Sequence, residues 1–421
     1  HLSIRRQRQM CIRDSQKNME SGISLKRAIT LVKIEKLNLS LESVNLENAY
    51  GRILGNGLKS KVDDPRFDNS AMDGWAVRKE DCSPNENTSL EIIGTSQAGS
   101  SKTFMISSGQ ACKIMTGAQI PKGANAIVMV EESKIDGNNV IILGPARDTY
   151  IRHKGENLLK GKKALSIGNF MDPASISLAA TMGYESIEVF RKPVIGIIST
   201  GDELVMPGSK IKDWEIYESN SFGIAALVQK MGGEAIRYDV VTDSLDGLRE
   251  SLNHAAKNCD AIITSGGVSM GDWDIVRKLM ELEGKIIFWR VDMRPGGPPL
   301  FGKWRGIPIF GLPGNPVSSH VVFSMLICPW FSASFGTSKD LSPNLGKQVR
   351  VKMLDNVKGA KGKLCLRRIR ITSDLNGLVA TTHTHQGSGN INSIVAHNGL
   401  TLLPPGTDAN VGEIIDAFWF N

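Results

Sequence analysis

Four short segments that are rich in glycine, proline and hydroxyl side chains could bind a phosphorylated ligand. Each follows a predicted apolar strand, and the segments are Ser199–Glu203, Thr242–Asp243, Ser265–Asp274 and Gly311–Ser318. Glycine lets backbone amides approach an anion, because no Cβ stands in the way. Ser265, Gly266 and Gly267 have the composition of an anion-binding nest. Pro316 and Ser318 lie near a predicted helix start, where free amides favour an anion.

Carboxylates accompany three of these segments. Glu203, Asp243 and Asp274 would repel a phosphate directly, so their presence predicts a bridging Mg²⁺ ion. Glycine-rich loops are often only turns, and an aspartate near a helix start is often only a cap. Because four such segments occur together, we favour the ligand-binding interpretation.

A fifth segment, Pro65–Arg78, mixes small, polar and aromatic residues without helical or strand periodicity. This composition favours a functional loop over a structural turn. Asp68 and Asp73 are its candidates for chemistry, and the alternative for Asp68 is a turn cap.

Arg294 is the candidate for binding an oxyanion. It ends a predicted strand and precedes a Pro-Gly turn, so it could present a fixed cation to a tetrahedral anion. The alternative is an ordinary surface arginine. His383 and His385 lack a third ligand at metal spacing, so we interpret them as ordinary polar side chains. Weaker candidates for the oxyanion role are Lys122, His153 and Lys154.

The elements that must position these residues form four regions. Strands alternate with helices over 191–335, which predicts an α/β catalytic domain with a largely parallel sheet. Ligands of such sheets bind beyond the carboxyl ends of the strands, so the four segments should converge on one crevice. The other regions are a helical and extended linker domain over 19–60 plus 150–190, a β insertion domain over 61–149 and a C-terminal β domain over 345–421. Within the linker domain, helices are expected near 23–37, 46–54 and 174–182.

The composition is that of a soluble multidomain protein. The chain has 421 residues, of which 41% are hydrophobic and 22% charged, and no uninterrupted apolar run approaches the ~18 residues of a membrane span. None of the six cysteines forms a C-x-x-C pair, so neither a zinc site nor a disulfide framework is expected. No N-terminal segment has the apolar core of a secretory signal, and we expect a cytoplasmic protein without a membrane partner.

Residues 1–18 resemble a translated sequencing adapter and show no helical or strand pattern. We interpret them as a non-native read-through segment and expect the natural start at Met19. The alternative is a basic arm that binds nucleic acid. The segment holds five basic residues and one acidic residue, so without it the formal charge falls from +7 to +3. The remaining chain has no concentrated basic run, which argues against a nucleic-acid partner.

Seven motifs together resemble the molybdopterin molybdenumtransferase family, which includes the E domain of gephyrin. The motifs are DNSAMDGWAVR at 68–78, IMTGAQIPKGANAIVM at 114–129, STGDEL at 199–204, SGGVSMGDWD at 265–274, RPGGP at 294–298, GLPGNPVS at 311–318 and HQGSG at 385–389. The resemblance extends from about residue 20 to the end of the chain, so it covers all four predicted domains.

The resemblance implies a fold and a reaction. The fold is an elongated homodimer of four-domain subunits, in which the α/β domain is similar to the molybdopterin adenylyltransferase fold. The reaction converts adenylyl-molybdopterin and molybdate to molybdenum-molybdopterin, AMP and water, with Mg²⁺. A transient contact with the adenylyltransferase is a further partner that the resemblance suggests.

The same resemblance carries roles onto individual residues. The expected catalytic residues, which would also be the metal ligands, are Asp73, Glu203, Asp243 and Asp274. The resemblance and the loop composition together predict that substrate is bound by Thr116, Ser265, Gly266, Gly267, Ser269, Arg294, Pro313, Gly314, Asn315, Pro316 and Ser318. Asp73 lies far in sequence from the other carboxylates, and the resemblance implies that the loop of one subunit faces the crevice of the other.

The chain departs from the family pattern at four positions. Asn157 stands where some members have aspartate, Glu218 replaces aspartate, Gly297 stands where lysine is common, and Thr384 replaces glycine. These departures bear on the oxyanion contacts more than on the reaction. Two alternatives are the adenylyltransferase itself, against which the flanking domains argue, and a non-enzymatic scaffold, against which the intact carboxylates argue. The choice between molybdate and tungstate stays open.

Overall fold

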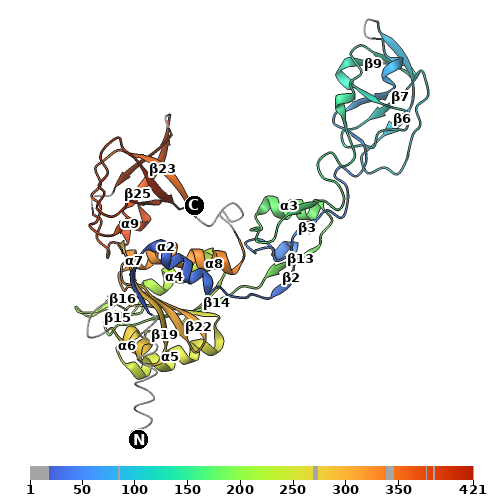
Figure 1. Cartoon of the computed structure of the whole chain (residues 1–421). Coiled ribbons are helices and arrows are strands. Elements are labelled where there is room, and N and C mark those ends of the chain that lie inside the picture. The colour runs from blue at the N-terminus through green and yellow to red at the C-terminus, as the bar shows by residue number, and fades with distance from the viewer. Residues whose placement is uncertain are drawn as a thin grey trace.

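The computed structural model describes residues 19–83, 86–268, 274–337, 346–375, 377–382 and 385–420. An α/β domain and a C-terminal β-barrel lie against each other, and a linker domain followed by a β insertion domain extends from them as an arm (Figure 1). This multidomain α/β and β architecture confirms the predicted fold class. The segment 1–18, which the sequence marked as foreign, lies outside the described residues.

The α/β domain is built on a seven-stranded sheet. In spatial order its strands are β1 (Glu20–Ile23), β19 (Lys285–Val291), β21 (Leu300–Trp304), β22 (Ile307–Leu312), β18 (Ala261–Ser265), β14 (Val194–Ser199) and β17 (Glu234–Arg237). Neighbouring strands are parallel, except that β21 lies antiparallel to both β19 and β22. The sequence did not predict β21, because its residues are buried on both faces and show no apolar-polar alternation.

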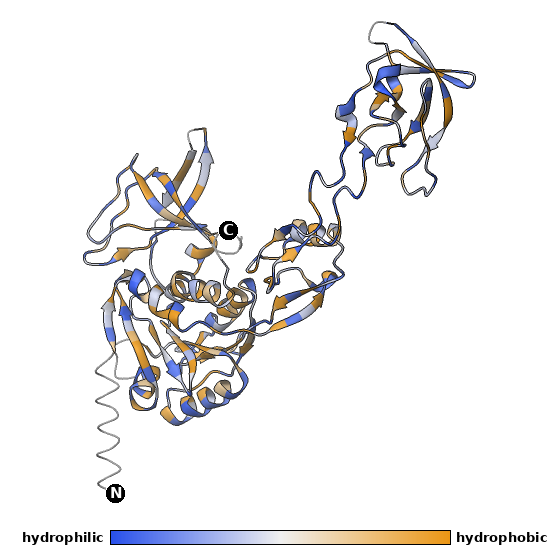
Figure 2. Cartoon of the chain, turned by 45° about the vertical axis from the view of Figure 1, so that its right-hand side comes forward, coloured by the Kyte–Doolittle hydropathy of each residue, from blue (hydrophilic) through white to orange (hydrophobic). Residues whose placement is uncertain are grey.

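Helices cover both faces of this sheet (Figure 1). On the face toward the C-terminal barrel lie α2 (Leu25–Ile34), α4 (Asn220–Lys230), α7 (Pro316–Val322), the π-helical η5 (Phe323–Ile327) and α8 (Cys328–Ser334). On the opposite face lie α5 (Leu245–Asn258) and α6 (Ile275–Glu283). Figure 2 shows hydrophobic and hydrophilic residues alternating along these helices, as one-sided burial requires. Each layer closes over its own apolar cluster, one around Phe301 and Phe310 and the other around Leu252 and Trp304.

One helical stretch, Pro316–Ser334, is long and apolar enough to cross a membrane by length and composition alone. Of its most apolar window, 67% is buried inside the protein. Trp330 packs edge-on against Phe310 of the sheet and against Phe331 of its own helix. Because the sheet and α2 already cover its apolar side chains, we interpret the stretch as a core helix of the α/β domain.

The first elements of the chain belong to the α/β domain, although the sequence had placed residues 19–60 in the linker domain. β1 pairs in parallel with β19, and α2 packs on α8 and η5. Helix α2 begins after Ser24, whose hydroxyl accepts a hydrogen bond from the Arg27 N–H group at 3.2 Å. The boundary was misplaced because a single edge strand that pairs with a segment far along the chain leaves no local signal.

The linker domain is made from two separated chain segments. β2 (Leu41–Asn45) pairs with β13 (Ser186–Phe190), and β3 (Leu58–Lys59) pairs with β12 (Lys163–Leu165). Helix α3 (Pro173–Thr181) lies close to its predicted position. The helix predicted over 46–54 is wrong: only η1 (Leu46–Asn48) is helical, and the apolar residues that follow are buried by bridges to the second segment.

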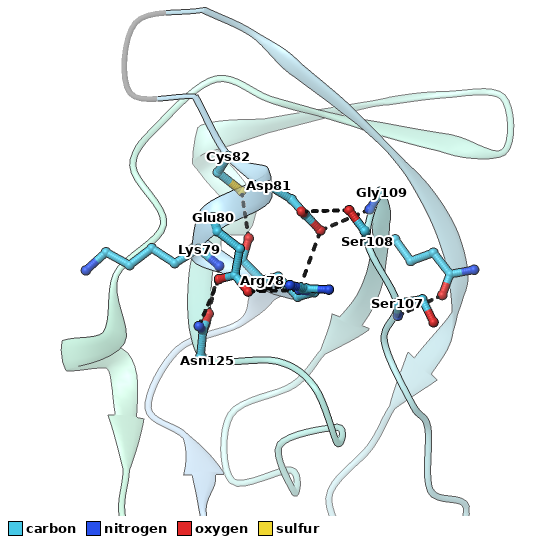
Figure 3. Close-up of polar contacts among 10 residues, drawn as sticks. Arg78, Lys79, Glu80, Asp81, Cys82, Ser107, Ser108, Gly109 and Asn125 are labelled. Atoms are coloured by element: carbon cyan, nitrogen blue, oxygen red, sulfur yellow. Dashed lines mark hydrogen bonds and ion pairs between the residues drawn. The ribbon is translucent and has the colours of Figure 1, made fainter.

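The β insertion domain lies at the far end of the arm (Figure 1). Its six strands, in spatial order, are β8 (Ala126–Met129), β5 (Gly74–Val77), β7 (Gln110–Ile114), β6 (Thr88–Ser96), β10 (Asn139–Ile142) and β9 (Ser133–Asp136). A polar cluster closes one end of this sheet (Figure 3): Arg78 pairs with Glu80 at 2.7 Å, and Asp81 accepts bonds from the Ser108 hydroxyl and the Gly109 amide, both at 2.9 Å. Because Arg78, Glu80 and Asp81 all have hydrogen-bond or ion-pair partners within the cluster, we interpret the cluster as structural.

The C-terminal domain is a closed barrel that docks on the α/β domain. Its strands, in barrel order, are β23 (Lys347–Met353), β26 (Gly377–Thr382), β25 (Arg368–Asp374), β27 (Gly399–Thr401) and β28 (Ile414–Trp419). The docking contact is a two-stranded parallel ladder between β20 (Met293–Arg294) and β24 (Leu364–Cys365). Backbone pairing across a domain boundary fixes the two domains in register, so residues near this ladder are held with little freedom.

Candidate functional site

The predicted crevice is a cavity of about 680 Å³ at the carboxyl edge of the α/β sheet. All four predicted loops line it, and they contribute Thr200, Gly201, Glu203, Asp243, Ser265, Gly266, Gly267, Asp274, Pro313, Gly314, Asn315, Pro316 and Ser318. The predicted convergence is therefore observed, while the chemical roles of these residues stay predictions. Ser269, which was also expected to bind substrate, lies outside the described residues.

The glycine loop after β18 has a backbone that only glycine tolerates. Gly266 and Gly267 have φ angles of 98° and 65°. A Cβ on Gly266 would lie 2.7 Å from the carbonyl oxygen of Thr200, which is too close for any side chain. The two glycines therefore bring the loop against β14 and leave no side chain on this part of the cavity wall, while the Gly266 N–H group donates to the carbonyl oxygen of Leu312 at 3.0 Å.

Two residues that the sequence did not single out as builders of the site hold its loops together. Asn220 donates from Nδ2 to Ser265 Oγ at 2.8 Å and to the carbonyl oxygen of Gly314 at 2.6 Å, so it joins two of the loops. Glu218 is 2% exposed and accepts hydrogen bonds from the Ser199 hydroxyl and from the amide and hydroxyl of Ser221. A carboxylate three residues before a helical N–H group is a capping signal that could have identified Glu218.

The charge of this cavity is acidic. Among the described residues that line it, four are carboxylates and none is lysine or arginine, and the carboxylates are Glu203, Glu218, Asp243 and Asp274. Burial raises the pKa of Asp243, and the neighbouring carboxylates of Asp202, Glu203 and Asp274 raise it further. Asp274 stands at the N-cap position of α6, but its side chain makes no capping hydrogen bond to the described amides of that helix. The alternative of a simple cap is therefore not supported for Asp274.

Replacing Asp243 by asparagine should stabilise the metal-free protein. A carboxyl group whose folded pKa is raised destabilises the fold once pH exceeds its ordinary value of 3.8, and the full effect is present at neutral pH. The neutral amide would remove that repulsion, so we expect the unfolding temperature in EDTA to rise by about 1–2 °C at pH 7.5, with no difference at pH 3. Thermal scans at both pH values check this, and a lower unfolding temperature for Asp243→Asn at pH 7.5 would contradict it.

A second cavity, of about 710 Å³, lies between the α/β domain and the C-terminal barrel. Its charge is opposite: among the described residues, five cations line it and no carboxylate does. The cations are Arg290, Arg294, Lys361, Lys363 and Arg367. Arg294, the predicted oxyanion residue, therefore lies in a basic environment to which the barrel contributes three of the five charges.

The two cavities adjoin each other. Pro298 and Ser318 line both of them. Ser318 lies in the first turn of α7, which begins at Pro316 as the sequence predicted, and it is 4% exposed. One amide of this helix start is already occupied, because the Val317 N–H group donates to the carbonyl oxygen of Ser388 in the barrel at 3.1 Å. A ligand could therefore extend from the acidic cavity into the basic one past Ser318.

The structure does not bring Asp73 to the other predicted carboxylates within one chain. Asp73 directly precedes β5 of the insertion domain, at the far end of the arm from the α/β sheet (Figure 1). Its Oδ1 atom accepts hydrogen bonds from the amide and hydroxyl of Thr116, at 2.6 Å and 3.0 Å. The amide bond, and then the hydroxyl bond, lower the pKa of Asp73. The ionised Asp73 and the neutral Thr116 thus form a separate hydrogen-bonded pair in the insertion domain.

The weaker oxyanion candidates lie away from both cavities. Lys154 forms an ion pair with Asp63 at 3.4 Å, and His153 Nδ1 lies 3.7 Å from Asp68. Asp68 also accepts a hydrogen bond from the Lys154 amide at 2.7 Å, so its interpretation as a turn cap is favoured. Lys122 lies in the insertion domain, where its backbone pairs with Phe104. His385 contacts Asn390, and His383 and Thr384 lie outside the described residues.

Three family descriptions match consecutive parts of the chain. The description "MoeA N-terminal region (domain I and II)" matches residues 23–183, "Probable molybdopterin binding domain" matches 196–333, and "MoeA C-terminal region (domain IV)" matches 350–420. The second match contains every residue that lines the acidic cavity except Gly389, and the third contains Gly389 and the barrel side of the basic cavity.

Whole-chain comparisons agree with these matches. The molybdopterin molybdenumtransferase of Haemophilus influenzae is 34% identical over 329 residues, which are 78% of this chain and 80% of the relative. That of a Nostoc species is 34% identical over 375 residues, which are 87% and 85% of the two chains. A crystal structure of the molybdopterin biosynthesis MoeA protein from Pyrococcus horikoshii OT3 superposes with a TM-score of 0.81 at 28% identity, over 95% of this chain and 100% of that one. The chain therefore belongs to the molybdopterin molybdenumtransferase family, whose members are transferases of molybdenum cofactor biosynthesis.

Proposed function

We propose that the protein transfers molybdate to adenylyl-molybdopterin and releases AMP, as a Mg²⁺-dependent transferase. The observation that supports this proposal best is the contact between an acidic and a basic cavity at the edge of one sheet. One substrate carries a phosphoanhydride, which a metal-assisted acidic site can bind, and the other is a free oxyanion, which needs cations. A site with a single charge sign would serve only one of the two.

The acidic cavity suits a Mg²⁺ ion. Carboxylate oxygens are the ligands that Mg²⁺ prefers, and the ion usually takes one or two of them together with substrate phosphates. Burial and the facing carboxylates raise the pKa of Asp243, so a cation placed among them would relieve an existing repulsion. The described residues hold no group of three His, Cys, Asp or Glu side chains arranged to bind a metal, so substrate phosphates or water would have to supply part of the ligand set.

The proposed mechanism rests on positioning. A bound Mg²⁺ would polarise the phosphoanhydride and offset the charge that develops on it. One or two of the carboxylates of Glu203, Asp243 and Asp274 would hold the ion at the sheet edge, and the glycine loop after β18 would let the phosphate approach without a Cβ in the way. Arg294 would hold molybdate on the other side of Ser318, so that an oxygen nucleophile can approach phosphorus. Fixed charges and dipoles of this kind usually supply the largest share of catalysis.

We also propose that the active unit is a symmetric homodimer. Asp73 is ionised and hydrogen-bonded to Thr116 at the end of an arm, yet both residues lie far from the crevice of their own chain. If the arm of each subunit reaches the crevice of the other, two equivalent shared sites result.

The shared site predicts complementation between two inactive variants. In a heterodimer of Asp73→Ala and Asp274→Ala chains, one of the two sites combines an intact arm with an intact crevice. We expect about half of the wild-type AMP release per dimer, whereas each homodimeric variant stays inactive. Differently tagged chains allow the heterodimer to be purified and assayed. Heterodimers that are as inactive as both parents would contradict a shared site.

The proposed reaction is tested by measuring AMP release from adenylyl-molybdopterin. We expect release to require Mg²⁺ and to accelerate with molybdate, and parallel reactions with tungstate would show which oxyanion is preferred. AMP release that is independent of any oxyanion would contradict the proposal. Production of adenylyl-molybdopterin from ATP would instead identify the adenylyltransferase reaction. A cytoplasmic location and a transient contact with the adenylyltransferase remain part of the proposal, to be tested by fractionation and cross-linking.

A further inference from the structure

The wall of the basic cavity has a gap at Gly297, and the ammonium group of Lys363 lies beside it. A Cβ built on Gly297 would lie 3.8 Å from Lys363 Nζ and 3.1 Å from the carbonyl oxygen of Met293. The two residues come from different domains, because Gly297 follows β20 of the α/β domain and Lys363 precedes β24 of the barrel. The ammonium group is therefore in van der Waals contact with the point where a side chain at 297 would begin.

The position of Lys363 is fixed by backbone structure on both sides. It ends a tight turn in which its N–H group donates to the carbonyl oxygen of Ala360 at 3.4 Å and Gly362 has a φ angle of 69°. The next residue, Leu364, pairs with Met293 in the interdomain ladder. The ladder sets Arg294 opposite Cys365, two residues after Lys363, so both cations line the same cavity when the two domains are docked.

The charge of Lys363 has no partner within the described part of the chain. Among the residues that the structure describes, the side chains of Arg294, Lys361 and Lys363 make no hydrogen bond or ion pair. Lys361 is exposed, whereas Lys363 is partly buried. A partly buried cation that faces other cations is destabilised by burial and by repulsion, and an anion bound between them would relieve both.

We propose that Lys363 binds the tetrahedral oxyanion together with Arg294 and supplies the cation that position 297 lacks. This inference rests on the proposed function, since it takes molybdate as the oxyanion. It adds a specificity-determining residue from the barrel to the oxyanion site predicted at Arg294 of the α/β domain. Because the two cations come from different domains, the oxyanion site is complete only when the barrel is docked.

The test is molybdate binding to the full-length protein, measured by titration calorimetry with sodium molybdate. Lys363→Ala should raise the dissociation constant about tenfold, the effect of losing one charged hydrogen bond. The matched control, Lys352→Ala, removes an exposed lysine of the same barrel and should leave the constant unchanged. Thermal unfolding of each variant shows that the fold is retained.

A second-site change tests the geometry. The φ angle of Gly297 is not in the left-handed region, but a Cβ there would lie 3.1 Å from the carbonyl oxygen of Met293, so this backbone must shift by a few tenths of an ångström to admit a side chain. The double variant Gly297→Lys/Lys363→Ala should recover molybdate binding to within about threefold of wild type.

The outcomes separate the two proposals. If wild-type protein binds molybdate and releases AMP but Lys363→Ala binds it equally well, the inference is wrong and the proposed function stands. If the double variant binds molybdate as weakly as Lys363→Ala does, a lysine at position 297 does not replace Lys363. The part of the inference that links Lys363 to position 297 is then wrong. If wild-type protein neither binds molybdate nor responds to it in AMP release, the proposed function itself fails.

Discussion

Replacing Asp274 by asparagine should slow AMP release at saturating molybdate by about a hundredfold and should increase the Mg²⁺ concentration that half-maximal rate requires. Loss of one well-placed charge contact to a reacting group typically costs ~3 kcal/mol of transition-state stabilisation. Asp274 lines the acidic cavity beside Asp243 and Glu203, so its carboxylate is placed to hold the ion that the phosphoanhydride needs. Asparagine keeps the shape and removes only the charge.

The effect should be catalytic rather than structural. Asp274 stands at the N-cap position of α6, but its side chain makes no capping hydrogen bond to the described amides of the helix, and asparagine caps as well as aspartate does. We therefore expect an unfolding temperature within about 1 °C of wild type. The matched control is Asp246→Asn, an aspartate in the first turn of α5 whose side chain is 95% exposed and which should not alter AMP release. Equal Mg²⁺ dependence in wild type and Asp274→Asn would show that the metal is held elsewhere.

The sequence predicted the crevice because its signals are local. A glycine-rich loop, a following helix start and a carboxylate at a strand end can each be identified within a few residues, and the parallel-sheet rule then places them at one edge. Gly266, Asp243 and Pro316 were identified in this way, and all three line one cavity. The same reasoning gave the carboxylates and Arg294 different roles. The structure places the carboxylates in one cavity and Arg294 in the adjoining one.

What the sequence missed depends on long-range pairing. β1 joins the sheet through a strand far along the chain, and β21 is antiparallel and buried on both faces, so neither carries a periodic signal. Asn220 and Glu218 act by joining loops that are distant in sequence. The basic cavity could not be predicted for the same reason, because three of its cations come from the barrel and meet Arg294 only through the interdomain ladder.

Replacing Arg294 by alanine should mainly raise the molybdate concentration needed for half-maximal rate, by about a hundredfold, and should change the Mg²⁺ dependence little. Arg294 lies in the cavity that five cations and no carboxylate line among the described residues, while the predicted Mg²⁺ ligands line the neighbouring one. A guanidinium presents two parallel donors to an oxyanion, and alanine removes both. Because Gly297 has no side chain that could compensate, only the neighbouring cations of the cavity remain to hold the oxyanion in Arg294→Ala.

The decisive measurement is the pair of concentration dependences for both variants. Asp274→Asn should shift the Mg²⁺ dependence and Arg294→Ala the molybdate dependence, each leaving the other nearly unchanged. Arg294→Lys is the conservative variant: it keeps the charge but loses the bidentate geometry, so its molybdate requirement should lie between wild type and Arg294→Ala. If Arg294→Ala leaves the molybdate dependence unchanged, the oxyanion does not bind in the basic cavity beside Arg294. The charge separation between the two cavities would then not correspond to a division between the two substrates.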